Sequence, residues 1–280
     1  MTNALYPLYG DDPKVITLIP ERVAERYGYQ TDPKKRQTSA HEWHSDMSFE
    51  ENPCDYSSLR LGQVPDTGGD TLYASAYDLY DRMSEPFQKL FENLSVQWGD
   101  PHYTKACGTE GTYKGPRGSP ANVGFGFDAT HPAVRTNPVT GWNAIFAGGM
   151  HCRGFEGVTE EESNRLMTMI EDLITKNHDI QARIRWEAPG DIAIWDNRAV
   201  KHIPTRDVEG KGKRKGFRVL SAGEKPFLAP AGTGRQVWRD GQKDGGMAGR
   251  IDRERKVETG LKNGAPVEAM NGNVNGVTAH

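Results

Sequence analysis

The sequence has 280 residues with 35 Lys and Arg against 38 Asp and Glu, and a net charge of -3 gives no indication of a nucleic-acid partner. Apolar runs stay well short of the roughly 18 residues of a membrane span, and the N-terminus lacks a secretory layout, so we expect a cytoplasmic protein that does not enter membranes. Cys54, Cys107 and Cys152 lie far apart, which indicates neither a disulfide framework nor a cysteine zinc site.

Short apolar runs separated by Gly and Pro predict a body rich in strands. The predicted strands are residues 57–64, 69–75, 142–148, 180–188, 191–197 and 216–222.

Two helical stretches interrupt these strands. Residues 76–94 predict two short helices broken near Ser84. Residues 159–177 predict a longer helix, which Thr159 and Glu162 begin with a capping box. Its apolar face consists of Leu166, Ile170, Leu173 and Ile174.

This order of elements predicts a mainly β fold, a β-sandwich or jelly roll with helices packed outside. From residue 228 onward the sequence is rich in Gly, Asn and charge. We therefore expect one domain over residues 1–227 and a flexible polar tail over residues 228–280.

The segment "HEWHSDMSFEENP" begins at His41 and places two histidines and an aspartate close together. Apolar side chains at alternating positions favour a strand over a helix. These side chains are Trp43, Met47 and Phe49. On a strand, His44 and Asp46 share one face and His41 points to the other, so the metal-binding pair is H-x-D.

A metal held by His44 and Asp46 needs a further protein ligand. His202 follows the apolar run "DIAIWDN" and its polar turn, which predicts an imidazole at the mouth of a barrel. The other internal candidates are His102, His131, His151 and His178. Two histidines and one carboxylate form the facial triad of Fe(II) oxygenases. In the alternative interpretation, His44 caps a turn and His202 lies in a polar loop.

Five blocks in order resemble the taurine dioxygenase family of Fe(II)- and 2-oxoglutarate-dependent oxygenases, from about residue 5 to residue 227. They are "WHSDMSFEENP", "TGGDTLYASAYDLYDRMSEPFQKLFENL", "HPAVRTNPVTGWNAIFAGG", "WEAPGDIAIWDNRAVKH" and "RKGFRVLSAGEKPF". The resemblance implies a double-stranded β-helix (jelly roll) core with flanking helices. It also implies that His44, Asp46 and His202 bind Fe(II), and that 2-oxoglutarate and O2 are cosubstrates.

The resemblance implies that Thr71 in "GGDT" and Arg214 in "KRKGFR" hold the distal carboxylate of 2-oxoglutarate. A buried carboxylate calls for a planar bidentate donor, which Arg supplies and Lys does not. We interpret the neighbouring lysines 211, 213 and 215 as a solvated basic loop.

Arg218 lies four residues beyond Arg214, on the same face of the predicted strand. The resemblance implies that it pairs with an anionic group of the substrate; the alternative is a structural ion pair. Tyr9 in "LYPLYG" and Phe146 in "NAIFAGG" match positions near the substrate in the taurine enzymes. An ordinary core position is an equally good interpretation of Phe146.

Two positions depart from the taurine enzymes. Tyr6 replaces an expected His, and Ala40 replaces an expected Asn, which argues against taurine itself. The several dozen residues that relatives carry before "LYPLYG" are also missing from this sequence.

The resemblance thus implies a dioxygenase that hydroxylates a C–H bond of a small sulfonate or carboxylate and releases succinate and CO2. The alternatives are a dioxygenase acting on a specialised metabolite, a zinc hydrolase, and a metal-binding protein without turnover. The oligomeric state is left open.

Overall fold

The structure is a computed structural model that describes residues 15–20, 38–101, 104, 116–124, 126–208 and 210–243. The chain divides into two compact units, Met1–Arg235 and Gln236–His280. The described strands all lie in the first unit. This unit extends past residue 227, where the sequence predicts the domain to end. Among the described helices, none combines the length and the apolar character that a bilayer span requires.

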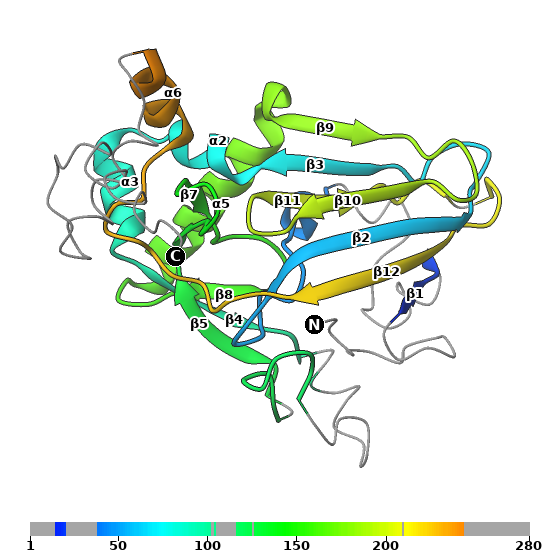
Figure 1. Cartoon of the computed structure of the whole chain (residues 1–280), viewed down its shortest axis with the longest axis horizontal. Helices are drawn as coiled ribbons and strands as arrows, with labels where there is room; N and C mark the ends of the chain where they lie inside the picture. Colours follow the sequence, from blue (N-terminus) through cyan, green and yellow to red (C-terminus); the bar gives the residue numbers. More distant parts are fainter. Residues whose placement is uncertain are drawn as a thin grey trace, which may run out of the picture. The chain divides into compact units, whose positions relative to one another are not determined.

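Two antiparallel sheets form the part of the body that carries the site (Figure 1). The major sheet has the order β1 (Ile16–Leu18), β12 (Lys215–Ala222), β2 (Cys54–Gln63) and β10 (Ile192–Asp196). The minor sheet has the order β11 (Val200–Pro204), β3 (Thr71–Ser75) and β9 (Gln181–Ile184).

Two smaller antiparallel groups complete the described strands. One consists of β5 (Asp128–Pro132), β4 (Ser95–Gly99) and β8 (Cys152–Phe155), and the other of β6 (Val134–Thr136) and β7 (Asn143–Ile145). The six predicted strands are confirmed as β2, β3, β7, β9, β10 and β12. The remaining strands are short or polar and carry little of the alternation that predicts a strand.

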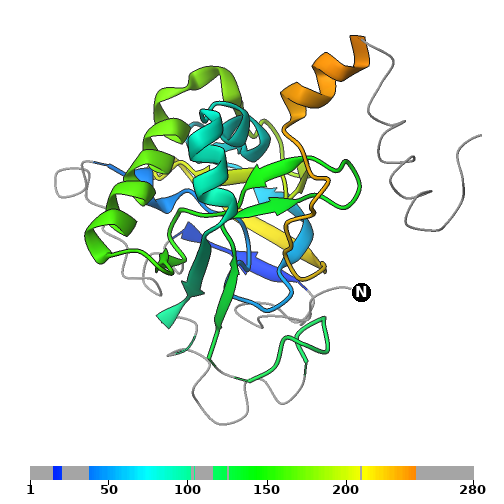
Figure 2. The ribbon, with the colours of Figure 1, turned by 90° about the vertical axis from the view of Figure 1, so that its left-hand side faces the viewer.

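The helices of the first unit lie close together, as Figure 2 shows. The predicted pair is confirmed as α2 (Ala76–Asp81) and α3 (Glu85–Glu92), with Ser84 as the N-cap of α3. The long helix α5 (Glu160–Lys176) begins with the predicted capping box of Thr159 and Glu162. Its predicted apolar face packs on the hydrophobic core. Short 3₁₀ turns cover Ala40–Glu42 and His178–Ile180.

The chain beyond residue 227 continues along the β6–β7 hairpin. The backbone N–H of Ala229 donates to Thr136 Oγ1 at 2.9 Å, and that of Asn143 donates to the carbonyl of Thr233 at 2.8 Å. Helix α6 (Arg235–Lys243) then begins within the segment predicted as tail. Residues 244–280 lie outside the described part, so the predicted flexibility of the tail stays a prediction.

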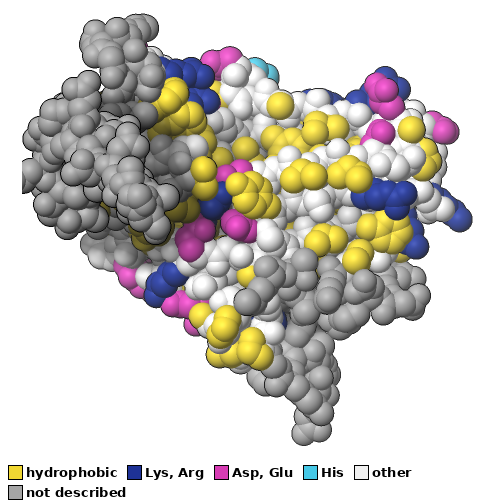
Figure 3. All heavy atoms as spheres, viewed as in Figure 1, with side chains coloured by type: hydrophobic (Ala, Val, Ile, Leu, Met, Phe, Trp, Pro, Cys, Tyr) yellow, Lys and Arg dark blue, Asp and Glu magenta, His cyan; other side chains and the backbone are white. Residues whose placement is uncertain are grey.

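The outer face of the major sheet carries apolar side chains in the open, as Figure 3 shows. Ile192 and Ile194 on β10 are 58% and 72% exposed, and Tyr56 on β2 is 43% exposed. Their strand neighbours Ala193 and Trp195 point inward and are buried. The alternation defines the inner face of β10, and this face carries Trp195 toward the candidate site.

A buried ion pair anchors the chain just after the H-x-D segment. Arg117 donates to both carboxylate oxygens of Glu50, at 2.6 and 2.8 Å, and both side chains are 2% exposed. The Glu50 carbonyl is also held by His131 Nε2 at 2.9 Å. The anchor fixes where the polypeptide leaves the site.

We expect Arg117→Met to lower the free energy of unfolding by about 3–5 kcal/mol, because it leaves the Glu50 carboxylate buried without its cation. Lys225→Met is the matched control, since Lys225 pairs with Glu51 at the surface, and it should change stability by less than about 1 kcal/mol. Urea unfolding of both variants measures the difference; equal losses would contradict the prediction.

Candidate metal centre

Backbone pairing brings two distant histidines together. The N–H of His44 donates to the carbonyl of His202 at 3.0 Å, and the N–H of His202 donates back at 2.8 Å. The predicted strand for the H-x-D segment was wrong: His44 forms an isolated bridge, and a turn begins at Asp46. Met47 has a positive φ of 58° in this turn. The turn, rather than strand parity, brings the Asp46 carboxylate beside His44.

The side chains of His44, Asp46 and His202 converge. One ligand atom from each lies within 4.8 Å of the other two. Asp46 Oδ1 is 3.8 Å from His44 Nε2 and 3.7 Å from His202 Nε2. His44 Nδ1 lies 2.8 Å from the Glu42 carbonyl, which places the proton on Nδ1 and leaves Nε2 as the ligand atom.

The other candidate histidines lie outside this cluster where the structure describes them. His41 is exposed. His131, His151 and His178 are likewise not among the metal-binding groups found in the described ranges. His102 lies outside the described residues.

Asp46 is held both through its carboxylate and through its backbone. Ser57 Oγ on β2 donates to Oδ2 at 2.8 Å, so Oδ1 faces the imidazoles. The side chain of Asn197 accepts from the Asp46 N–H at 2.8 Å and donates to its carbonyl at 3.0 Å. Sequence reasoning missed Ser57, because a single serine in a strand carries no signal of its partner.

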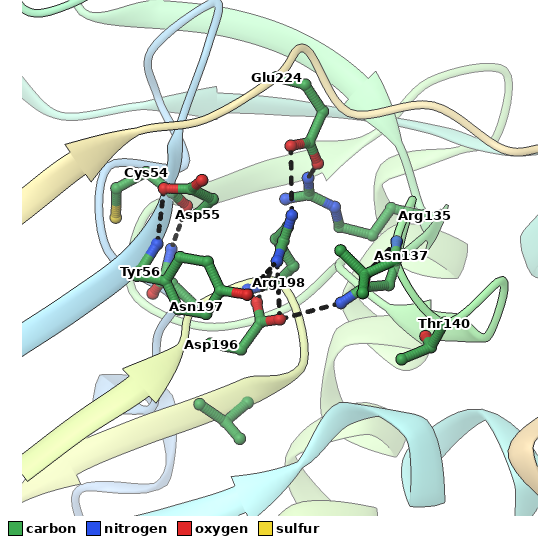
Figure 4. A network of polar contacts seen from close by, with 12 residues as sticks. Cys54, Asp55, Tyr56, Arg135, Asn137, Thr140, Asp196, Asn197, Arg198 and Glu224 are labelled. Atoms are coloured by element: carbon green, nitrogen blue, oxygen red, sulfur yellow. Dashed lines mark hydrogen bonds and ion pairs between the residues drawn. The ribbon is translucent and has the colours of Figure 1, made fainter. Parts of the chain in front are cut away.

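The turn that carries Asn197 is held by a network of charges (Figure 4). Arg198 donates to both carboxylate oxygens of Asp196 at 2.9 Å and to the Tyr56 hydroxyl at 2.9 Å. Arg135 pairs with Glu224 beside it. These contacts hold the turn that leads from β10 to β11, the strand that carries His202.

The electrostatics leave the three side chains in the protonation states that a divalent cation needs. Burial lowers the pKa of His44 well below its usual value and that of His202 to about 4, so both imidazoles are neutral. Burial opposes ionisation of Asp46, but the positive charge of Arg218, the largest opposing influence, together with the hydrogen bond from Ser57 favours the carboxylate, and the pKa falls to about 2. Two neutral imidazoles and one carboxylate suit Fe(II) and other first-row metals.

Arg218 lies directly at the ligand cluster. Its Nη1 donates to Asp46 Oδ1 at 2.6 Å, and its Nη2 is 3.4 Å from His202 Nε2. Its Nε is buried and has no hydrogen-bond partner among the described residues. The guanidinium therefore touches the carboxylate and retains an unused donor.

Thr71 and Arg214 come from the two different sheets, at the start of β3 in the minor sheet and just before β12 in the major sheet. Thr71 begins β3 and accepts a hydrogen bond from Trp186 Nε1 at 3.2 Å. Arg214 is buried just before β12 and donates from Nε to the Gly69 carbonyl at 2.9 Å. A Cβ on Gly69 would lie 2.8 Å from Arg214 Cδ, so glycine at this position leaves room for the guanidinium.

Several buried donors around the site have no partner in the described part of the chain. They are Arg214 Nη2, Arg218 Nε, Tyr73 Oη and Trp195 Nε1. Burial raises the pKa of Tyr73, which keeps its hydroxyl protonated. Each unsatisfied donor costs about 1–3 kcal/mol. A ligand with several acceptor oxygens, such as a dicarboxylate, is suited to these donors.

The remaining predicted substrate contacts are placed differently. The Phe146 ring packs in the hydrophobic core, 5.0 Å from the Trp98 ring and 5.0 Å from the Arg135 guanidinium. This favours its interpretation as a core residue. Tyr9 and Tyr6 lie outside the described residues, and Ala40 begins a 3₁₀ turn.

We expect Ser57→Ala to weaken metal binding by about 10- to 100-fold, because it removes the hydroxyl that orients the Asp46 carboxylate. Ser58→Ala is the matched control: its hydroxyl contacts the Val219 carbonyl at 3.4 Å, and its side chain points to the other face of β2. Titration of each variant with Co(II) measures the affinity. Equal affinities in the two variants would refute the role of Ser57.

The family model "Taurine catabolism dioxygenase TauD, TfdA family" matches residues 7–220. An alpha-ketoglutarate-dependent dioxygenase, oryG, of Aspergillus oryzae is 49% identical over 235 residues, which cover 84% of this chain and 69% of the relative. An alpha-ketoglutarate-dependent sulfonate dioxygenase of Saccharomyces cerevisiae is 32% identical, over 68% of this chain and 44% of its own length. This chain thus spans less than half of the yeast relative.

A solved structure supports the fold. The crystal structure of a putative alpha-ketoglutarate-dependent taurine dioxygenase from Burkholderia xenovorans superposes with a TM-score of 0.62, at 23% identity, over 83% of this chain and 70% of the other. With the family model covering most of the sequence, the chain belongs to the TauD, TfdA family, whose named relatives are alpha-ketoglutarate-dependent dioxygenases.

Proposed function

We propose that this protein is an Fe(II)- and 2-oxoglutarate-dependent dioxygenase that hydroxylates a C–H bond of a small anionic substrate. The observation that carries the proposal is the convergence of His44, Asp46 and His202 beside unpaired buried guanidinium donors. Because these groups come from strands of two facing antiparallel sheets and the segment paired with them, we further propose a double-stranded β-helix core.

Each side chain has a defined task in this proposal. His44, Asp46 and His202 hold the metal, and Ser57 and Asn197 keep the carboxylate in place. Fe(II), 2-oxoglutarate and O2 together supply the oxidising chemistry, with succinate and CO2 as products. Arg214, whose pKa burial and Arg218 lower only to about 10, remains a cation at neutral pH.

Thr71 and Arg214 receive the distal carboxylate of 2-oxoglutarate. Both side chains are buried, so the bound carboxylate exchanges its hydrogen bonds with water for hydrogen bonds from two fixed donors. The unused Nη2 of Arg214 is one donor. The hydroxyl of Thr71, which already accepts from Trp186, has its own proton to donate.

Arg218 binds the anionic group of the substrate. Its guanidinium lies at the edge of the ligand cluster, and its unused Nε gives it a donor beyond the contact with Asp46. A sulfonate, sulfate ester or carboxylate offers acceptor oxygens of the geometry that guanidinium recognises. The sulfonate named for the yeast relative is one member of this class.

The proposal is tested by succinate formation from 2-oxoglutarate in the Fe(II)-loaded protein, with a panel of sulfonates, sulfate esters and carboxylates. We expect substrate-coupled turnover in the wild type and a loss of at least about 100-fold in His44→Ala, which lacks a metal ligand. Arg218→Ala should impair anionic substrates more than neutral ones. Full activity of His44→Ala would refute the metal assignment, and equal effects of Arg218→Ala on both substrate classes would refute the anion contact.

The same measurement separates the competing functions. A zinc hydrolase would process esters with Zn(II) bound and would leave 2-oxoglutarate unchanged. A metal-binding protein without turnover would retain Fe(II) and form no succinate with any substrate.

We expect Arg214→Lys to raise the KM for 2-oxoglutarate by about 10- to 100-fold, because a lysine cannot offer the planar pair of donors. Lys213→Met is the matched control, since Lys213 is exposed in the same loop, and its KM should stay within about twofold of the wild type. Steady-state kinetics at saturating substrate measure both values. An unchanged KM in Arg214→Lys would assign the distal carboxylate to another residue.

A further inference from the structure

His151 lies beside the ligand cluster and has no task in the proposed chemistry. Its ring centroid is 5.9 Å from that of His44, in a T-shaped contact. The side chain is buried, and its Nδ1 is 3.1 Å from Oδ2 of the buried Asp100, a close ion-pair contact without the geometry of a hydrogen bond. A second histidine–carboxylate pair thus stands next to the candidate metal site.

The backbone that leads to His151 is fastened to both ligand-bearing segments. Gly149 has a φ of 99° and lies so close to the Trp43 carbonyl that a Cβ would be 1.9 Å from its oxygen. Lys201, which precedes His202, donates to the Gly148 carbonyl at 3.1 Å. The position of His151 relative to the metal ligands is therefore set by the fold.

Two simpler roles account poorly for this pair. His151 is not a further metal ligand, because the cluster found among the described residues contains only His44, Asp46 and His202. A packing role needs only an apolar ring, whereas burying an imidazole with a carboxylate costs free energy. A polar ligand that hydrogen-bonds to His151 would offset the free energy that burying this pair costs.

We propose that His151 and Asp100 form a substrate-recognition element, in which the Asp100 carboxylate beside Nδ1 favours a proton on that nitrogen, and Nε2 accepts a hydrogen bond from a hydroxyl or amine group of the substrate. This inference rests on the proposed function and narrows its substrate class. Arg218 binds an anionic group, and His151 selects anions that also carry a hydrogen-bond donor.

The test compares 1-alkanesulfonates of two to six carbons with their ω-hydroxy and ω-amino counterparts of equal length. Binding to the anaerobic protein loaded with Fe(II) and 2-oxoglutarate is measured by calorimetry. We expect the wild type to bind the best donor-bearing probe about tenfold more tightly than its plain counterpart, the effect of one hydrogen bond. His151→Phe should reduce this ratio to about one, with the affinity for the plain sulfonate within about twofold of the wild type.

Further variants separate recognition from packing. His151→Gln keeps a hydrogen-bonding group and should restore part of the preference, and Asp100→Asn should reduce it by removing the charge that favours a proton on Nδ1. His131→Phe is the control for replacing a buried histidine that is outside the ligand cluster. It removes the hydrogen bond to the Glu50 carbonyl and should keep the full ratio of affinities. The melting temperature of each variant checks folding.

The inference is overturned if the wild type shows no preference for donor-bearing probes, or if His151→Phe retains it. Because binding is measured without turnover, its outcome is separate from that of the proposed function. A preserved preference with no succinate formed from any probe would support recognition by His151 and count against the dioxygenase activity.

Discussion

The antiparallel pairing of His44 with His202 is the contact on which the whole site depends. These two hydrogen bonds attach the H-x-D segment to β11 and so to the minor sheet. On that sheet His202 stands opposite Tyr73, and their rings stack at 6.0 Å. Thr71 lies two residues before Tyr73 and therefore shares its face of β3. One pairing thus connects His44 and His202 to the strand that carries Thr71, the proposed cosubstrate contact.

Charge explains why such a site accepts anions. Among the described residues, the Arg218 guanidinium contacts the Asp46 carboxylate, and the Arg214 guanidinium is buried with an unpaired Nη2. Burial makes charged donors without a full set of partners costly. In the proposed function the carboxylate oxygens of 2-oxoglutarate and the anionic group of the substrate satisfy these donors.

The sequence was informative where local pattern decides structure. It predicted the long helix with its capping box, the break at Ser84 and six of the strands, because periodicity and caps act within a few residues. It also pointed to the three side chains that converge, although the strand assumed for His44 and Asp46 was wrong. Contacts between residues far apart in the sequence could not be predicted from local pattern. Ser57 contacts Asp46, and Tyr73 lies opposite His202, only because their strands come together with distant segments in the fold. The contact of Arg218 with Asp46 likewise depends on register that only the folded sheet defines.

The residues proposed for chemistry and the residue proposed for substrate recognition lie on different kinds of structural element. His202, Thr71 and Arg218 lie on strands, and the two backbone hydrogen bonds of His44 tie it to one of them. In the proposed function, sheet geometry therefore fixes the metal, the cosubstrate and the anionic group. His151 instead ends a glycine-containing connection between β7 and β8, where side chains change without disturbing strand pairing. In a fold arranged in this way, substitutions in the connections between strands can change the substrate specificity while the strands keep the same oxidation chemistry. Ala40, one of the departures from the taurine enzymes, also lies outside the paired strands, in a 3₁₀ turn. In the proposed function, the segments around the metal centre therefore select the C–H bond.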